Sequence, residues 1–220
     1  MPERKRRVCL ANHLVEFPKD LRDPIAHLKR VDPILGDIIA QIGACEIAYA
    51  EPDFETLVRS IVLQQLSGKA ARAIFARLKD ALGNGSRITA KGILSLTSPQ
   101  MVAVGLSRRK IEYIRDLAEK TEAGLIQFAR LASATDEEVI QHLTAVRGVG
   151  VWTAQMFLLF ALRRPDILAT GDLGIRSAIR KAYRLRKLPT PARVEKLAAK
   201  WHPHCSAACW YLWRSTVTVL

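Results

Sequence analysis

The sequence predicts an all-α protein, and two observations lead to this fold class. After about residue 20, apolar residues recur at spacings of three and four, the periodicity of amphipathic helices. Most of these segments open at or near a Ser, Thr or Asp, which are residue types that cap the amino-terminal end of a helix. Strand-like alternation is almost absent, so we expect helices joined by short loops.

The expected helices follow in order along the chain. Asp53 caps the first of the well-defined ones, whose apolar face ends near Gln64–Ser67. The next segments run through Ala73, Ile74 and Leu78, and then over Pro99–Val104, Ser107–Thr121 and Asp136–Val146.

The stretch Val151–Leu162 is almost uninterruptedly apolar, which predicts a helix buried on most sides. A turn at Thr170–Asp172 then leads into a basic helix that carries Arg176 and Arg180, and an aromatic helix around Trp210–Trp213 closes the chain.

A length of 220 residues suits one domain or two small, closely packed subdomains. Residues 1–20 contain a run of basic residues at Arg4–Arg7, and we expect this arm to be flexible. Residues 21–220 are expected to form one compact body.

The charge balance indicates a polyanionic partner. Lysines and arginines number 34 against 21 acidic residues, a net charge of +13, which attracts nucleic acid at long range. A solvated basic surface without a ligand is the alternative. No apolar run is long enough to span a bilayer, because Arg163 and Arg164 interrupt the longest one, so no membrane partner is expected.

The four cysteines are expected to be reduced intracellular thiols. Cys205 and Cys209 are interpreted as small apolar residues one helical turn apart, in preference to metal ligands. An iron-sulfur cluster would need two further ligands nearby, and the sequence has none there. We therefore expect no metal in the protein body and no such cluster.

Two glycines one residue apart, Gly148 and Gly150, lie between a predicted helix end and the next helix start. Glycine accepts positive φ and lets the backbone approach a ligand, and helix amino termini attract phosphate. The hairpin Gly148–Val149–Gly150, with Thr153 following, is therefore predicted to bind the DNA backbone without selecting sequence. A simple turn between packed helices is the alternative.

These motifs resemble the helix-hairpin-helix superfamily of base-excision DNA glycosylases, and within it the 3-methyladenine DNA glycosylase II branch. The resemblance covers about residues 25–220 and rests on Gln64–Ser67, Gly148–Ala154 and Trp210–Arg214. It implies a two-subdomain helical glycosylase fold, with a helix-hairpin-helix motif and the active site in the cleft between subdomains. It also implies a minimal form without the N-terminal β domain that longer members of the branch carry.

The resemblance assigns the catalytic carboxylate to Asp172, where local sequence alone favours an ordinary helix cap. Such a carboxylate stabilises the positive charge that develops on the sugar. Trp152 occupies the position where bifunctional relatives carry a nucleophilic lysine, which implies direct hydrolysis by water.

The remaining roles are also implied by the resemblance. Trp152 and Trp213 are expected to wall a pocket for a cationic base, with core packing as the alternative. Met156 lies where an aromatic residue often lines this pocket, and Cys205 stands where a basic residue is expected. Gln65 and Leu66 are the candidates for the wedge that fills the gap left by a flipped nucleotide; a polar turn and a core leucine are the alternative.

Ser107 and Lys110 open another predicted helix and are candidates for a second phosphate contact; a plain capped helix is equally consistent with the pattern. No cofactor is expected to be required, although a monovalent cation at the hairpin is conceivable.

The sequence thus predicts a monofunctional glycosylase that excises alkylated purines from duplex DNA. It is expected to act as a monomer, in a bacterial cytoplasm near the nucleoid or in a eukaryotic nucleus. The alternatives are a non-catalytic helix-hairpin-helix DNA-binding module and a bifunctional glycosylase-lyase for oxidised bases.

Overall fold

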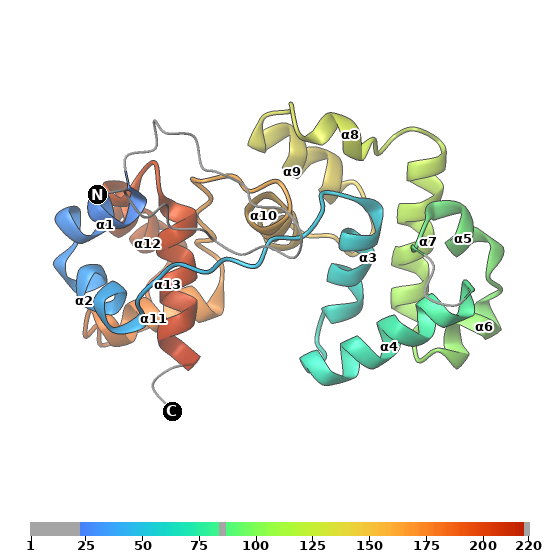
Figure 1. The fold of residues 1–220 in the computed structure, drawn as a ribbon, viewed down its shortest axis with the longest axis horizontal. Coiled ribbons are helices and arrows are strands. Elements are labelled where there is room, and N and C mark those ends of the chain that lie inside the picture. Colours follow the sequence, from blue (N-terminus) through green and yellow to red (C-terminus); the bar gives the residue numbers. More distant parts are fainter. Residues whose placement is uncertain (1–22, 84–86, 218–220) are drawn as a thin grey trace, which may run out of the picture. The chain divides into compact units, whose positions relative to one another are not determined.

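The computed structural model describes residues 23–83 and 87–217 (Figure 1). Every regular element within these residues is a helix, which confirms the predicted all-α class. The basic arm predicted at residues 1–20 lies outside the described residues. None of the described helices combines the length and hydropathy that crossing a bilayer requires.

The chain divides into two compact units. One unit is continuous in sequence, from Ala50 to Leu162, and the other combines the residues up to Tyr49 with those from Arg163.

The continuous unit contains helices α3 to α10. Their bounds are α3 Phe54–Leu63, α4 Gly68–Ala81, α5 Ala90–Ser95, α6 Ser98–Ala103, α7 Arg108–Glu122, α8 Phe128–Leu131, α9 Asp136–Thr144 and α10 Val151–Phe160.

Helix α7 is the centre of this unit, because α3, α5 and α6 all pack against it. Its apolar stripe of Ile111, Ile114, Leu117 and Ala118 is buried, as spacings of three and four residues require. Figure 1 shows α5 and α6 beside α7. Helix α10 packs against α9 and buries Phe157 to Leu159. Its first two residues, Val151 and Trp152, are exposed, so the prediction of a helix buried on most sides fails at its start.

Most helices begin at the predicted type of capping residue. The side chains of Asp53, Ser67, Ser107, Thr135 and Asp172 each accept a hydrogen bond from a backbone amide in the following first turn. These bonds satisfy amides that have no acceptor inside the helix.

The discontinuous unit contains α1 Pro24–Val31, α2 Pro33–Ile42, α11 Leu173–Ala182, α12 Pro191–Ala198, the short 3₁₀ helix η1 Ala199–Trp201 and α13 Cys205–Val217. Helix α13 packs against both α2 and α11 (Figure 1). This packing brings the carboxyl-terminal aromatic helix against the helix that starts at Asp172.

A buried carboxylate joins the two sequence-distant parts of this unit. Asp32 is 1% exposed and caps α2 through the amide of Leu35. It also accepts hydrogen bonds from Tyr183 and from Nε1 of Trp201 at 2.8 Å, and its Oδ2 lies 3.2 Å from Nζ of Lys200. Burial raises the pKa of Asp32, but these donors outweigh burial and leave its pKa below the ordinary value.

Candidate functional site

The two glycines of the hairpin between α9 and α10 differ in their surroundings. Gly148 has a φ of 75°, and a Cβ there would lie 2.1 Å from Cδ2 of Tyr113. Gly150 precedes α10 with a φ of −94°, and an added Cβ would meet nothing within 4 Å. Gly148 is therefore required by conformation and packing, whereas Gly150 leaves open space beside the amino terminus of α10.

Helix α7 holds this hairpin through a carboxylate. Oδ2 of Asp116 accepts a hydrogen bond from the amide of Arg147 at 2.9 Å and another from Nζ of Lys120 at 2.6 Å. Burial raises the pKa of Asp116, but these two donors outweigh it and leave the pKa below its ordinary value. The side chain of Val149 is buried, and its amide donates to the carbonyl of Val146 at 3.1 Å.

The side chain of Thr153 is only 5% exposed. A contact of Thr153 with DNA would therefore use its backbone amide, which lies in the first turn of α10 where amides have no acceptor within the helix. Such amides and the positive end of the helix dipole favour a phosphate.

The turn between α3 and α4 lies beside the hairpin. Nε2 of Gln64 donates to the carbonyl of Gly148 at 2.9 Å, which joins the turn to the hairpin within one unit. Gln65 has a positive φ of 56°, and Leu66 is 39% exposed. The two predicted wedge residues thus project from a supported turn. Sequence reasoning missed the role of Gln64, because nothing in the sequence distinguishes it from Gln65.

Lys110 has a structural role that the sequence did not predict. Its Nζ donates to the carbonyls of Val62 and Gln64 at 2.7 and 2.8 Å, at the end of α3. Burial lowers the pKa of Lys110. Ser107 caps α7 by accepting from the amide of Lys110 at 3.4 Å, which agrees with the alternative of a capped helix. A phosphate contact by Ser107 or Lys110 remains a prediction.

In the discontinuous unit, Asp172 is 8% exposed and caps α11. Its Oδ1 accepts a hydrogen bond from the amide of Ile175 at 2.7 Å and a second from Nε1 of Trp213 at 2.8 Å. Two donors on one oxygen fix the orientation of the carboxylate. The cap expected from local sequence and a carboxylate held for chemistry therefore coexist.

Gly174 allows Trp213 to reach this carboxylate. A Cβ at Gly174 would lie 3.1 Å from Cδ1 of Trp213 and 3.1 Å from Oδ1 of Asp172, which is tighter than ordinary contact. Sequence reasoning missed Gly174, although a glycine in the first turn of a helix was an available signal.

Trp152 and Met156 belong to the continuous unit and lie one turn apart on α10, on the same face of the helix. Trp152 is 48% exposed and Met156 is half-buried, so Trp152 is not a core residue. The side chain at position 152 has no amine that could attack a sugar.

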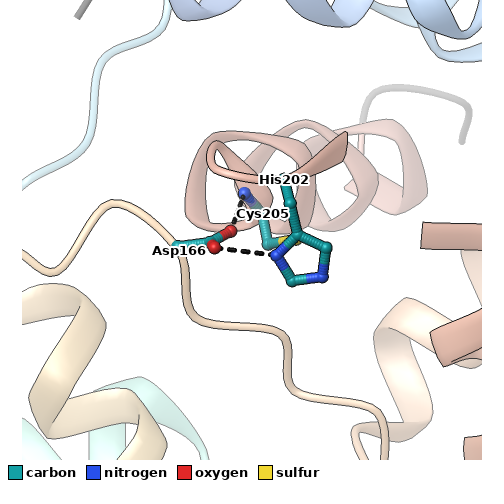
Figure 2. Close-up of side chains that lie close together, drawn as sticks. All are labelled: Asp166, His202 and Cys205. Carbon is teal, nitrogen blue, oxygen red and sulfur yellow. Dashed lines mark hydrogen bonds and ion pairs between the residues drawn. The ribbon is translucent and has the colours of Figure 1, made fainter. Parts of the chain in front are cut away.

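One group of possible metal ligands occurs within the described ranges 23–83 and 87–217. It consists of Asp166, His202 and Cys205, whose ligand atoms all lie within 4.8 Å of one another (Figure 2).

Residues 58–204 match the model of the HhH-GPD superfamily base excision DNA repair protein. DNA-3-methyladenine glycosylase 1 of Schizosaccharomyces pombe is 40% identical over 164 residues, which are 74% of this chain and 72% of that protein.

Two solved structures share the fold at similar sequence identity. The S. pombe 3-methyladenine DNA glycosylase in complex with abasic DNA has a TM-score of 0.81 at 35% identity, covering 88% of this chain and 96% of that one. A DNA-3-methyladenine glycosidase from Bacillus halodurans has a TM-score of 0.80 at 33% identity and covers 92% of both chains.

Proposed function

Since the chain belongs to the HhH-GPD superfamily of base excision DNA repair proteins, and is a DNA glycosylase, we propose that it hydrolytically removes alkylated purines from duplex DNA. The proposal places it among the type II 3-methyladenine DNA glycosylases and makes it monofunctional. The observation that carries the chemistry is the carboxylate of Asp172, held by two donors on one oxygen.

Cleavage of an N-glycosidic bond places positive charge on the sugar. A fixed carboxylate stabilises that charge and orients or deprotonates the attacking water. The amide of Ile175 and the indole N–H of Trp213 keep Asp172 in one orientation before substrate binds, so little reorganisation is needed during the reaction.

Hydrolysis by water, in preference to attack by a protein amine, is supported by Trp152. Its indole cannot form a Schiff base with the sugar, so the product is an abasic site with an uncut backbone. The half-exposed ring offers an aromatic face to a cationic base, an attraction worth about 0.5–2 kcal/mol depending on desolvation.

An alkylated purine such as 3-methyladenine or 7-methylguanine carries a positive charge in DNA and leaves as a neutral molecule. Its departure therefore requires no general acid, and one carboxylate is sufficient. The DNA-3-methyladenine glycosylases that this chain resembles support the same substrate class.

DNA is held, on this proposal, by the Gly148–Gly150 hairpin and the start of α10, which present amides to a phosphate. Leu66 and Gln65, in the adjacent turn, fill the space left by the rotated nucleotide.

The test is single-turnover release of 3-methyladenine and 7-methylguanine from methylated duplex DNA. Asp172→Asn keeps the cap, because Asn caps helices about as well as Asp, and release should fall by at least about 100-fold. Asp53→Asn is a matched control: Asp53 also caps a helix, through the amide of Thr56 at 2.8 Å, and release should not change.

Unchanged release by Asp172→Asn would refute the catalytic assignment. Salt-sensitive DNA binding without release of any base would favour the non-catalytic binding module. A covalent adduct trapped by borohydride would refute the role given to Trp152 and favour a glycosylase-lyase.

A further inference from the structure

A group of three chemically different side chains lies at the start of α13, away from any role in the proposed reaction. Nδ1 of His202 is 2.7 Å from Oδ2 of Asp166, and 3.6 Å from Sγ of Cys205. Figure 2 shows His202 and Cys205 at the helix start, facing the carboxylate of Asp166 on a neighbouring loop. In sequence, this loop precedes Asp172.

The backbone that carries these side chains is firmly attached. The amide of Cys205 donates to Oδ1 of Asp166 at 3.2 Å, which leaves Oδ2 directed at His202. The next residue, Ser206, receives a hydrogen bond from the amide of Ile167 at 2.9 Å and donates to the carbonyl of Arg164 at 2.6 Å. The two segments are therefore joined before any ion binds.

From this geometry we propose that Asp166, His202 and Cys205 form a zinc-binding site. Imidazole nitrogen, thiolate sulfur and carboxylate oxygen are the ligand atoms that Zn²⁺ takes in proteins, and a mixed set containing sulfur disfavours Mg²⁺ and Ca²⁺.

The distances fit a tetrahedral ion with a small adjustment. At usual zinc bond lengths two tetrahedral ligands lie about 3.5 Å apart, which matches the 3.6 Å between Cys205 Sγ and His202 Nδ1. The 2.7 Å between Nδ1 of His202 and Oδ2 of Asp166 is a hydrogen-bond distance, and it lengthens when the ion takes the place of the proton between these atoms. Binding thus moves that proton to Nε2 of the neutral imidazole and releases the thiol proton of Cys205 to solvent.

Solvent reaches one side of the site, which supplies the fourth ligand. The side chain of His202 is 48% exposed and that of Asp166 is 32% exposed, whereas Cys205 is buried. Three protein ligands and one water are a common zinc coordination set.

The site would attach the segment leading to Asp172 to the helix that carries Trp213. Asp166 precedes Asp172 by six residues, and Cys205 and Trp213 lie two turns apart on α13. Zinc would therefore stabilise the discontinuous unit.

The experiment uses the full chain with Cys9→Ser and Cys45→Ser. These substitutions remove the two thiols that lie outside α13. After chelator treatment, Zn²⁺ is titrated against a chromophoric chelator, and Co²⁺ is added in parallel to detect thiolate-to-cobalt charge transfer. We expect the protein to bind one equivalent of either ion, and the cobalt form to show a thiolate-to-cobalt charge-transfer band. Free zinc at about 100 times Kd should raise the melting temperature by roughly 5–10 °C.

Cys205→Ser should abolish the cobalt band, and His202→Asn should weaken zinc binding by more than about 100-fold. His202 is on the surface, so its replacement leaves the fold intact. His142→Asn is the matched control, because His142 is exposed on α9 and should leave binding unchanged.

The proposal is overturned if the protein binds no equivalent of zinc, or if zinc binding is retained both in Cys205→Ser and in His202→Asn. An Asp166–His202 pair that merely caps α13 would show neither the cobalt band nor the zinc-dependent rise in melting temperature. None of these readouts depends on base release, so they are independent of the proposed catalytic function.

Discussion

Replacing Trp213 by Phe isolates one hydrogen bond at the proposed catalytic centre. The substitution keeps an aromatic ring but removes the indole N–H that donates to Oδ1 of Asp172 at 2.8 Å. The amide of Ile175 still donates to the same oxygen, so the helix cap remains. The substitution thus removes one of the two described constraints on the carboxylate orientation.

The expected effect follows from the strength of a hydrogen bond to a charged group, about 1.5–3 kcal/mol. At about 1.36 kcal/mol per tenfold change in rate, the complete loss of this energy in the transition state would slow base release by roughly 10- to 150-fold. Because Ile175 retains part of the constraint, we expect a fall near the lower end, about tenfold. DNA affinity should not change, since Trp213→Phe alters no backbone contact.

The assay is single-turnover release of 7-methylguanine at saturating enzyme, together with fluorescence anisotropy for DNA affinity. Trp210→Phe is the matched control, because Trp210 is on the same helix and packs against Tyr211 with ring centroids 4.9 Å apart. Equal rates for Trp213→Phe and the parent protein would refute the positioning role. An equal loss in both variants would reassign the effect to packing of α13.

Two further substitutions test the hairpin and the buried network. Gly148→Ala should destabilise the protein by at least about 2 kcal/mol in urea unfolding, because position 148 has a positive φ and the ring of Tyr113 fills the space that a Cβ would need. Gly150→Ala should leave the free energy of unfolding within about 0.5 kcal/mol of the parent value but weaken DNA binding. Normal DNA binding by this variant would argue against a close approach of phosphate to Gly150. Asp32→Asn should cost about 1.5–3 kcal/mol at pH 7. Because the pKa of Asp32 is lowered in the folded state, its contribution to stability is complete above about pH 4 and is lost as pH falls through the folded pKa. The free energy of unfolding of the variant should therefore fall less steeply below pH 4 than that of the parent protein. Identical pH profiles of the two proteins would contradict this.

The helices and their caps were predictable from sequence because they depend on neighbours along the chain. Apolar spacing defined the buried stripe of α7, and Asp53 and Ser107 were recognisable as caps. The exposed start of α10 was not predicted, since apolar residues such as Val151 and Trp152 do not reveal which turn of a helix is covered.

The site was predictable only in part. The hairpin glycines stand out by their spacing, and the resemblance to a known family directed attention to Asp172. Gln64 and Lys110, by contrast, act through carbonyls that are distant in sequence, and no local pattern marks such partners.

By itself, the sequence determined the helical class, the family and the residue types available for chemistry, because periodicity, caps and motifs are local properties. Only the tertiary structure decided which donors hold Asp172. It also decided that Cys205 faces His202 and Asp166, where the sequence indicated only an apolar residue one turn from Cys209. These contacts join residues up to 41 positions apart in the chain, so packing brings together atoms that no spacing along the chain relates.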